Sequence, residues 1–372
     1  LRQTERTEKE CIKNKKRKEL CAGRGAGLRD SRGRRGLMES SCVSVHTEEA
    51  GMGKEITFEI PYIRLRFLTE LLADARMPET KTAALRGGMG EMMLRQNCVM
   101  DRNCGKCFFH KACIVRNAFY TRMEKKPAYV TGDESVGYLI ECTDPCTEFR
   151  KGSIFEFTMT LFGDSIAFFN IYLQAICHLG MNGLGKDRAR FRILEVRNSG
   201  ISSDQRGTVV RGNTVNIEEY RIGMLSDHIR KRKEKLQASN GAWSIKFLTP
   251  LSMKYRQEYM TEFWAEALVK GAARRVQMLD YYIGTEAEIP EFSAYPEIRA
   301  QDVRRSSVKR YSGTQDSHMT LRGIKGKAVF GSMPDECLDY LIAGELIHIG
   351  RNTSFGFGKY VLGREGSRDP EL

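Results

Sequence analysis

The stretch RFLTEL, Arg66–Leu71, is repeated almost unchanged as KFLTPL at Lys246–Leu251, and this repeat is the main indication of the fold. A second repeat accompanies it, because HLGMNGLGKDRARF, from His178, and HIGRNTSFGFGKY, from His348, both run from a histidine through glycines to basic residues. The offsets are 180 residues (246 − 66) and 170 residues (348 − 178). Two repeats at nearly the same spacing indicate a duplicated unit.

Each unit has the same predicted order of elements: a strand, a helix, a β-hairpin, a second helix, a glycine loop and a last strand. That order predicts an α+β fold of two tandem ferredoxin-like (RRM-like) domains with antiparallel sheets. In the first unit we expect a strand with a bulge near Pro61, a helix over 82–96, hairpin strands near 128–140 and 154–161, a helix from Asp164 and a last strand in RARFRILEV. In the second we expect a helix over 257–282, hairpin strands over 298–311 and 318–330, and a helix that Ser332 caps and Pro334 opens.

The domain boundaries follow from composition. Residues 1–53 are polar, glycine-rich and without periodicity, so we expect a disordered basic leader that is either inert or a weak RNA contact. We expect the first domain over 54–199, a connector over 200–241 and the second domain over 242–365. The connector contains DHIRKRKEKL, which predicts an exposed basic helix.

The charge balance limits the class of partner. The chain of 372 residues has a formal net charge of +13 and 9% aromatic residues, which favours a polyanion such as nucleic acid over a neutral metabolite. It contains no apolar run of about 18 residues and no secretory signal, so we expect a cytoplasmic protein with no membrane partner. Eleven cysteines, an odd number, do not resemble a secreted disulfide framework.

Four of those cysteines form C-x5-C-x2-C-x5-C in a short loop after the first predicted helix: Cys98, Cys104, Cys107 and Cys113. Four thiolates complete a tetrahedral zinc site and leave no open position for catalysis, so we predict a structural zinc in an insertion of the first domain. An iron–sulfur cluster also takes four cysteines and stays an alternative. We expect no catalytic metal.

The second glycine loop is a candidate phosphate cradle. Glycines let a phosphate oxygen approach main-chain amides, and neighbouring polar and basic side chains add hydrogen bonds and charge. The candidate RNA-binding residues here are Gly350, Arg351, Asn352, Thr353, Ser354, Gly356, Gly358 and Lys359. The alternative is that the glycines only close a tight turn from helix to strand. GMNGLGKD in the first loop mimics a nucleotide-binding motif, but it lacks the magnesium-binding hydroxyl and follows a helix instead of a strand.

The sequence resembles the endoribonucleases of the RAMP superfamily that cut CRISPR precursor transcripts. The resemblance rests on GELIHIGRNTSFGFGKY before the last strand, LRGGMGEMMLRQNC before the cysteine cluster, KRYSGTQ with LRGIKGKAVFGSM, and SIKFLTPLSMKY, in this order over residues 58–362. It implies an enzyme that binds CRISPR repeat RNA and releases guide RNAs, with other CRISPR effector or adaptation proteins as further partners. A non-cleaving guide-RNA-binding subunit of an effector complex is the alternative.

RNA carries its own nucleophile, because a base can activate a 2′-hydroxyl to attack the neighbouring phosphorus while an acid protonates the leaving 5′ oxygen. The expected products are a 2′,3′-cyclic phosphate and a 5′-hydroxyl. The family usually uses a histidine, helped by lysine or tyrosine, so we predict His348 as the main catalytic residue, with His178 at the equivalent place in the first unit. The alternative role of His348 is to cap a helix. Relatives place a histidine at the first helix, where this chain has MPETKTAALRG, so Lys81 and Tyr62 are the candidates there.

The second predicted hairpin contains VRRSSVKRYSG, which crowds cations around an aromatic ring: Arg304, Arg305, Lys309, Arg310 and Tyr311. Cations hold phosphates and the ring can stack on a base, so this hairpin is predicted to grip RNA. The alternative is an exposed charged hairpin with no ligand.

Overall fold

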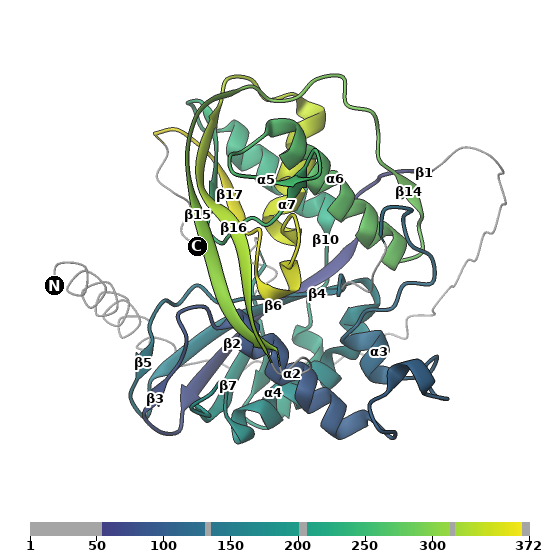
Figure 1. Cartoon of the computed structure of the whole chain (residues 1–372), viewed down its shortest axis with the longest axis vertical. Coiled ribbons are helices and arrows are strands. Elements are labelled where there is room, and N and C mark those ends of the chain that lie inside the picture. The colour runs from purple at the N-terminus through teal and green to yellow at the C-terminus, as the bar shows by residue number, and fades with distance from the viewer. Residues whose placement is uncertain (1–53, 131–134, 201–206, 313–316, 367–372) are drawn as a thin grey trace, which may run out of the picture. The chain divides into compact units, whose positions relative to one another are not determined.

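Both halves of the chain contain four antiparallel strands in the same order (Figure 1). They form the whole sheet of the second half, and in the first half they are part of a seven-stranded sheet to which β8 (Thr208–Arg211), β9 (Thr214–Val215) and β10 (Gly223–Met224) are added. The computed structural model describes residues 54–130, 135–200, 207–312 and 317–366, so the predicted leader lies outside the described residues. In the first sheet the four strands run in the order β4 (Tyr138–Glu141), β6 (Ile154–Phe162), β2 (Pro61–Leu71) and β7 (Phe191–Asn198). The second sheet runs β15 (Ile298–Ser312), β16 (Ser317–Phe330), β11 (Trp243–Phe247) and β17 (Tyr360–Arg364). Each half therefore has the ferredoxin-like order, which confirms the predicted fold class.

Helices connect these strands as the repeated order predicts. The first half has α2 (Thr82–Asn97) and α4 (Phe169–Asn182), and the second has α6 (Ala265–Tyr282) and α7 (Asp335–Ile347). Smaller elements fill the connections: β1 (Lys54–Glu55), β3 (Ala75–Arg76), η1 (Cys104–Lys106), α3 (Ile114–Ala118), β5 (Glu148–Phe149), η2 (Gly163–Phe168), η4 (Ile217–Glu219), α5 (Leu225–Gln237), β12 (Lys254–Tyr255), β13 (Glu258–Tyr259), β14 (Ala287–Glu288) and η5 (Thr353–Phe355).

The long strand β2 shows how the pattern of residues selects a face. Ile63, Leu65 and Phe67 are fully buried, while Arg64 and Arg66 alternate with them and point to the other side of the sheet. The predicted bulge lies elsewhere than expected. The register shift is at Leu68 and Thr69, opposite β7, and not at Pro61.

Two predicted helix starts need correction. The helix expected from residue 257 begins at Ala265, because β12 and β13 form a small hairpin before it. Arg256 and Gln257 make the turn with φ values of 48° and 69°, which a helix does not allow. Ser332 does not cap α7, since the N-cap position is Pro334 and no side chain accepts a bond there.

The basic helix of the connector is docked on the second domain by one face, so its predicted exposure is correct only for the other face, which includes Arg230 and Lys235. Leu225, Ile229 and Leu236 of α5 are buried. Arg232 donates to both carboxylate oxygens of Glu345 on α7, with Nε to Oε2 at 2.8 Å. Lys233 also pairs with Asp339 of α7, so these two cations hold α5 against α7, whereas Arg230 is exposed and pairs within α5.

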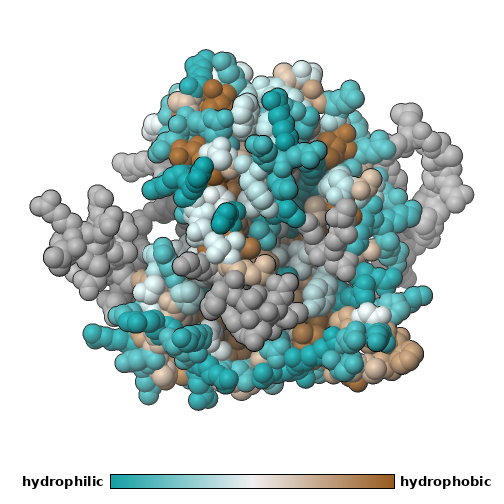
Figure 2. Space-filling view, in the orientation of Figure 1, coloured by the Kyte–Doolittle hydropathy of each residue, from teal (hydrophilic) through white to brown (hydrophobic). Residues whose placement is uncertain are grey.

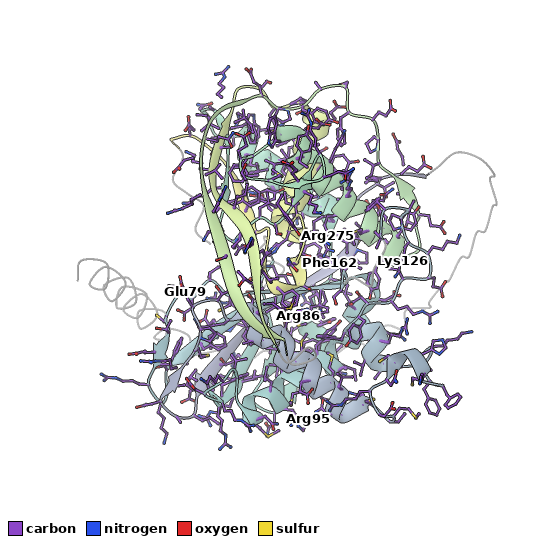
Figure 3. All side chains as sticks on the ribbon, viewed as in Figure 1. Glu79, Arg86, Arg95, Lys126, Phe162 and Arg275 are labelled. Carbon is purple, nitrogen blue, oxygen red and sulfur yellow. The ribbon has the colours of Figure 1, made fainter. Side chains whose placement is uncertain are left out.

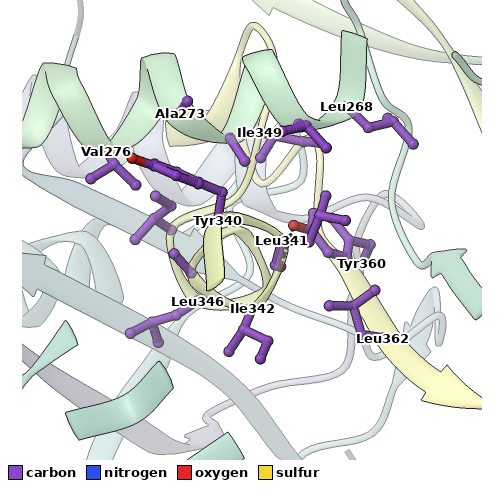
Figure 4. Packing of buried hydrophobic residues seen from close by; sticks show 14 of the residues in the cluster. Leu268, Ala273, Val276, Tyr340, Leu341, Ile342, Leu346, Ile349, Tyr360 and Leu362 are labelled. Carbon is purple, nitrogen blue, oxygen red and sulfur yellow. Dashed lines mark hydrogen bonds between the residues drawn. The ribbon is translucent and has the colours of Figure 1, made fainter. Parts of the chain in front are cut away.

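The two halves share part of one hydrophobic core. Figure 4 shows α7 packed among side chains of α6 and β17, with Tyr360 Oη donating to the carbonyl of Leu341 at 2.5 Å. The same cluster includes Ile60, Val136 and Phe162 from the first half. A second cluster fills the first half alone. Within the described residues, no helix is long and apolar enough to cross a membrane.

Candidate nucleic-acid interface

The open face of the second sheet collects cations from three strands. In the β15–β16 hairpin Arg304 lies directly opposite Lys325, and in the centre of the sheet Lys327 lies opposite Lys246. Residues directly opposite in an antiparallel pair share a face, and positions two apart along a strand share it too. Ile245 and Ala328 are fully buried on the core side, so these four basic residues, the hairpin face, all point away from the helices.

The positive charge of the hairpin face is only weakly neutralised. Lys327 pairs with Glu365 at 3.2 Å, but no ion pair joins Arg304 or Lys325 to a carboxylate of the described residues. Partial burial and the neighbouring Arg304 lower the pKa of Lys325, and Glu79 opposes this shift. Asp302, directly opposite Lys327, adds a carboxylate to this face, and Glu79 lies within electrostatic range of Lys325. Cations still outnumber acids there, so the face is electrostatically suited to bind a phosphate.

The open face of the first sheet is different, because its arginines are matched by acids. Arg64 pairs with Glu141 at 2.9 Å and Arg192 pairs with Glu70 at 2.7 Å. The remaining pairs of this face are Arg66 with Glu156, Arg197 with Glu195, and Arg211 with Glu195. The two sheets thus differ in free charge, and the second is the better anion surface.

The predicted hairpin residues extend this surface only in part. Arg304 and Arg305 are exposed, as predicted, and lie on opposite faces of β15. Lys309, Arg310 and Tyr311 belong to β15, but their side chains lie outside the described residues, so their predicted role stays a prediction.

The second glycine loop faces the interior of the protein. The prediction that its amides point outward is therefore largely wrong. The amides of Arg351 and Gly358 donate to the carbonyls of Ser252 and Pro250 at 2.7 and 2.9 Å. Those of Phe355, Gly356 and Phe357 bond within the loop, and that of Lys359 bonds to Thr249 Oγ1. Thr353, Ser354 and Lys359 are also buried, whereas Arg351 is exposed and Asn352 is half-buried.

The loop docks on the first domain. Thr82 Oγ1 of α2 donates to the carbonyl of Phe355 at 2.7 Å, and Arg86 Nε donates to Ser354 Oγ at 3.1 Å. The Arg86 guanidinium also lies 4.2 Å from the centre of the Phe355 ring. Gly356 has φ of 79°, and a Cβ there would lie 3.1 Å from the carbonyl oxygen of Ile140. Figure 3 labels Arg86 beside the end of the β15–β16 hairpin. Gly356 therefore serves close approach between the domains, a structural role that the alternative of a tight turn from helix to strand did not include.

A buried cluster of charges completes this dock. Glu141, at the end of β4, accepts from His348 Nε2 at 3.2 Å, from Arg64 Nη2 at 2.9 Å and from Lys359 Nζ. The other ring nitrogen of His348, Nδ1, lies 3.1 Å from the carbonyl oxygen of Phe357. Burial opposes the charge on Glu141, but Arg64, Lys359 and His348 together hold its pKa well below the usual range.

His348 is fully buried and ends α7 with φ of 58°. Burial lowers its pKa, and Lys359 adds to this, although Glu141 opposes it. The two ring nitrogens face Glu141 and the carbonyl of Phe357, so the ring links β4 to the glycine loop. The arrangement fits the alternative role at the helix end better than contact with a bound RNA, and catalysis by His348 stays a prediction that this burial does not favour.

The other three predicted catalytic residues have surroundings of their own. Lys81 is fully buried, and its Nζ donates to the carbonyl of Asp144 at 2.7 Å. Tyr62 is 4% exposed and lies edge-on to the ring of His228. His178 is exposed on α4, before a loop in which Leu184 and Ala189 form a bridge. That first glycine loop closes a tight turn, with Gly183 at φ of 89°.

The four clustered cysteines line one cavity together with Tyr120. Their number and chemistry fit a tetrahedral zinc, and all four are free thiols. Their sulfur atoms do not converge, however: over the described residues, no three His, Cys, Asp or Glu side chains form a ready coordination shell. The predicted zinc therefore stays a prediction.

Sequence reasoning missed Lys246, Lys325 and Lys327 as members of the hairpin face. The signal was present, because the lysines of LRGIKGKAVF alternate with small and apolar residues, as an amphipathic strand requires. The pattern did not reveal the strand register, which places Lys327 opposite Lys246 and Lys325 opposite Arg304.

Two family models match the chain. Residues 245–360 match "CRISPR-associated endoribonuclease Cas6", and residues 60–221 match the model named AF_1859_N, an N-terminal domain. The first of these covers the hairpin face and the glycine loop. A search of curated proteins finds no significant match.

Solved structures share the fold at low sequence identity. A "Partial Cas6-RT-Cas1–Cas2 complex" aligns with a TM-score of 0.53 and 14% identity over 85% of this chain and 48% of that one. A "Cas6-RT-Cas1–Cas2 complex" gives the same score and identity over 30% of its chain. The present chain thus spans half or less of those proteins. Thermus thermophilus Cas6 aligns with a TM-score of 0.42 and 11% identity, over 81% of this chain and 98% of that one.

Proposed function

We propose, from the premise that this chain is a Cas6-type CRISPR-associated protein over residues 245–360, that it binds CRISPR repeat RNA and cleaves the precursor transcript. The observation that carries the proposal is the hairpin face, since it lies inside the matched residues and brings four basic residues together, of which Arg304 and Lys325 form no ion pair with a described carboxylate. RNA phosphates supply the missing negative charge.

The proposed reaction is metal-independent transesterification. The 2′-oxygen forms a bond to phosphorus as the bond to the 5′ oxygen breaks, a base takes the 2′ proton, and an acid supplies a proton to the leaving oxygen. The products are a 2′,3′-cyclic phosphate and a 5′-hydroxyl. Cations that face the phosphorane stabilise its extra negative charge.

We assign the role of phosphorane-facing cation to Lys325. It lies on β16 within electrostatic range of Glu79, which precedes α2, so the hairpin meets the start of the first-domain helix there. Its lowered pKa also brings the ammonium closer to giving up a proton, as an acid for the leaving oxygen must. His348 is assigned a positioning role, because its ring holds β4 against the glycine loop.

The test is incubation of the full chain with repeat RNA in EDTA. Cleavage should persist, and the 3′ end of the upstream product should resist phosphatase until acid opens the cyclic phosphate. Lys325→Ala should slow cleavage by two to three orders of magnitude, roughly as for loss of an acid or a charge stabiliser. It should weaken binding far less. Products with a free 3′-hydroxyl would contradict the mechanism.

A second function, a guide-RNA-binding subunit that does not cleave, is favoured by one observation. His348, Lys81 and Tyr62 are all buried. Tight binding of repeat RNA with no product under the same conditions would select this function. For either function, the solved Cas6 complexes that contain Cas1 and Cas2 support other CRISPR proteins as partners.

We also propose that Cys98, Cys104, Cys107 and Cys113 hold a structural zinc. The support is the shared cavity and the four thiols, which match the ligand set of closed zinc sites. The metal would tie the loop after α2 to α3.

A further inference from the structure

The loop between the third and fourth cysteines of the cluster exposes two large rings that the fold does not use. Phe108 is 87% exposed and Phe109 is 55% exposed, and neither belongs to a hydrophobic cluster. Exposed phenylalanines are costly on a free surface and mark contact sites when they are grouped. Figure 2 shows apolar surface at the lower right, where Figure 1 shows the loop after α2.

Hydrogen bonds within the loop fix its backbone and so give the two rings defined positions. The amide of Lys106 donates to the carbonyl of Asn103 at 3.1 Å, and the amide of Ala112 donates to that of Phe109 at 3.1 Å. His110 Nδ1 lies 3.2 Å from the carbonyl oxygen of Cys107. The cysteine cavity lies beneath these turns.

The charge around the rings is positive. Lys106 and Lys111 flank them, both are exposed, and neither forms an ion pair with a carboxylate of the described residues. The nearest acids are occupied, since Glu91 receives Arg95 and Arg102, and Asp101 accepts from the amide of Asn103 at 3.0 Å. Aromatic rings between unpaired cations suit bases that stack and phosphates that follow them.

The cysteine loop and the hairpin face are connected through helix α2. Helix α2 contacts β15 and, through Thr82 and Arg86 in its first turns, the glycine loop. Its last residue, Asn97, leads directly into the cysteine loop. A helix of 16 residues is about 24 Å long, so RNA held at the hairpin needs a short extension to reach Phe108.

We propose that Lys106–Lys111, the ring loop, binds a single-stranded RNA segment that extends from the repeat. Bases stack on Phe108 and Phe109, and Lys106 and Lys111 contact the phosphates. This rests on the proposed function for the identity of the RNA. The stacking chemistry itself does not depend on cleavage. Docking of a protein on the same rings is the competing outcome.

The test compares three RNAs on the full chain: the repeat alone, the repeat with a single-stranded extension, and a short oligouridine carrying 4-thiouridine. For the parent protein we expect the extension to tighten binding and the oligouridine to crosslink within the ring loop. The double variant Phe108→Ala/Phe109→Ala should lose roughly tenfold or more in affinity for the extended RNA. It should bind the repeat alone as the parent does.

Two control variants test whether the aromatic rings themselves cause the loss of RNA affinity. Phe108→Tyr/Phe109→Tyr keeps both rings and should keep the affinity. Ile217→Ala removes another exposed apolar side chain, 77% exposed, and should change nothing. Equal gain from the extension in parent and double variant, with no crosslink in the ring loop, would overturn the inference. If the repeat is not bound at all, the proposed function fails, and the oligouridine crosslink still decides the ring loop.

Discussion

His348 and Glu141 are 207 residues apart in sequence and lie 3.2 Å apart in space, Nε2 to Oε1. One ends the last helix of the second domain and the other ends β4 of the first. With Lys359 and Arg64 they form a buried charge cluster that fixes the glycine loop between the domains. By holding the domains together, the loop also fixes the position of the proposed RNA surface.

Glu141→Gln should be strongly destabilising. The amide removes the negative charge that Lys359 and Arg64 share and leaves both cations without their buried partner. Loss of one member of a buried pair costs about 3–5 kcal/mol. Urea unfolding measures it. The matched control is Glu148→Gln, whose pair with Arg76 is exposed and should contribute little. Equal stability of the two variants would contradict the cluster's structural role.

Stability should fall as the pH drops from about 6.5. His348 has a lowered pKa in the fold, so the unfolded chain binds its proton first and is favoured as the pH falls below the ordinary histidine pKa. Glu141 also has a lowered pKa, so its contribution is present above the ordinary carboxyl pKa and is lost at more acid pH. Unfolding midpoints measured from pH 8 to 4 check the direction. Burial also lowers the pKa of His228, to about 3, so this histidine contributes to the decline in the same direction. His348→Gln should therefore reduce the upper part of the decline, and His228→Gln should reduce it further.

Asp280 should act in the opposite direction. Burial raises its pKa to about 7, and Oδ2 has no hydrogen-bond partner. A raised carboxyl pKa means that the fold binds the proton more tightly, so stability decreases as the pH rises through about 7. Asp280→Asn should therefore stabilise the protein at pH 8, and the gain should vanish near pH 4. A constant difference across this range would rule out the titration.

Gly356→Ala should loosen the glycine loop from the first domain. An alanine at this position must adopt a left-handed φ of 79°, and its Cβ would lie 3.0 Å from Thr82 Cγ2. Gly212→Ala is the control, because Gly212 has φ of 57° but nothing within 4 Å of its missing Cβ. The backbone term is roughly 1–2 kcal/mol for each. The excess loss of unfolding free energy in Gly356→Ala measures the contact between domains, and no excess would mean that the loop yields freely.

Metal analysis should find about one zinc ion per chain. Cys104→Ser should abolish it, lower the melting temperature and expose the loop after α2 to protease. Cys177→Ser, which removes an exposed thiol outside the cluster, should retain the metal. A metal-free protein that melts like the parent in the presence of a zinc chelator would contradict the assignment.

The topology was predictable because the repeated stretches mark equivalent places in two similar units, and alternation in β2 marks its buried face. The orientation of the glycine loop was not. Whether an amide of that loop points to solvent depends on Ser252 and Pro250, and its docking depends on Thr82, about 270 residues earlier. Local pattern holds no information on such partners.

The same limit explains the basic helix and the hairpin. The cations of α5 look solvent-exposed in sequence, yet Glu345 of α7 receives Arg232. The lysines of β16 look like ordinary surface charge until the register places Lys325 beside Arg304. Charge in sequence therefore predicts an anion surface only after its acidic partners have been found in space.

The most direct test of the central claim is the salt dependence of repeat-RNA binding by the double variant Arg304→Ala/Lys325→Ala. If the hairpin face holds RNA phosphates, the slope of log K against log salt should fall by about one for each lost contact. Arg192→Ala, which removes an exposed arginine paired with Glu70, should keep the parent slope. An unchanged slope in the double variant would contradict the account.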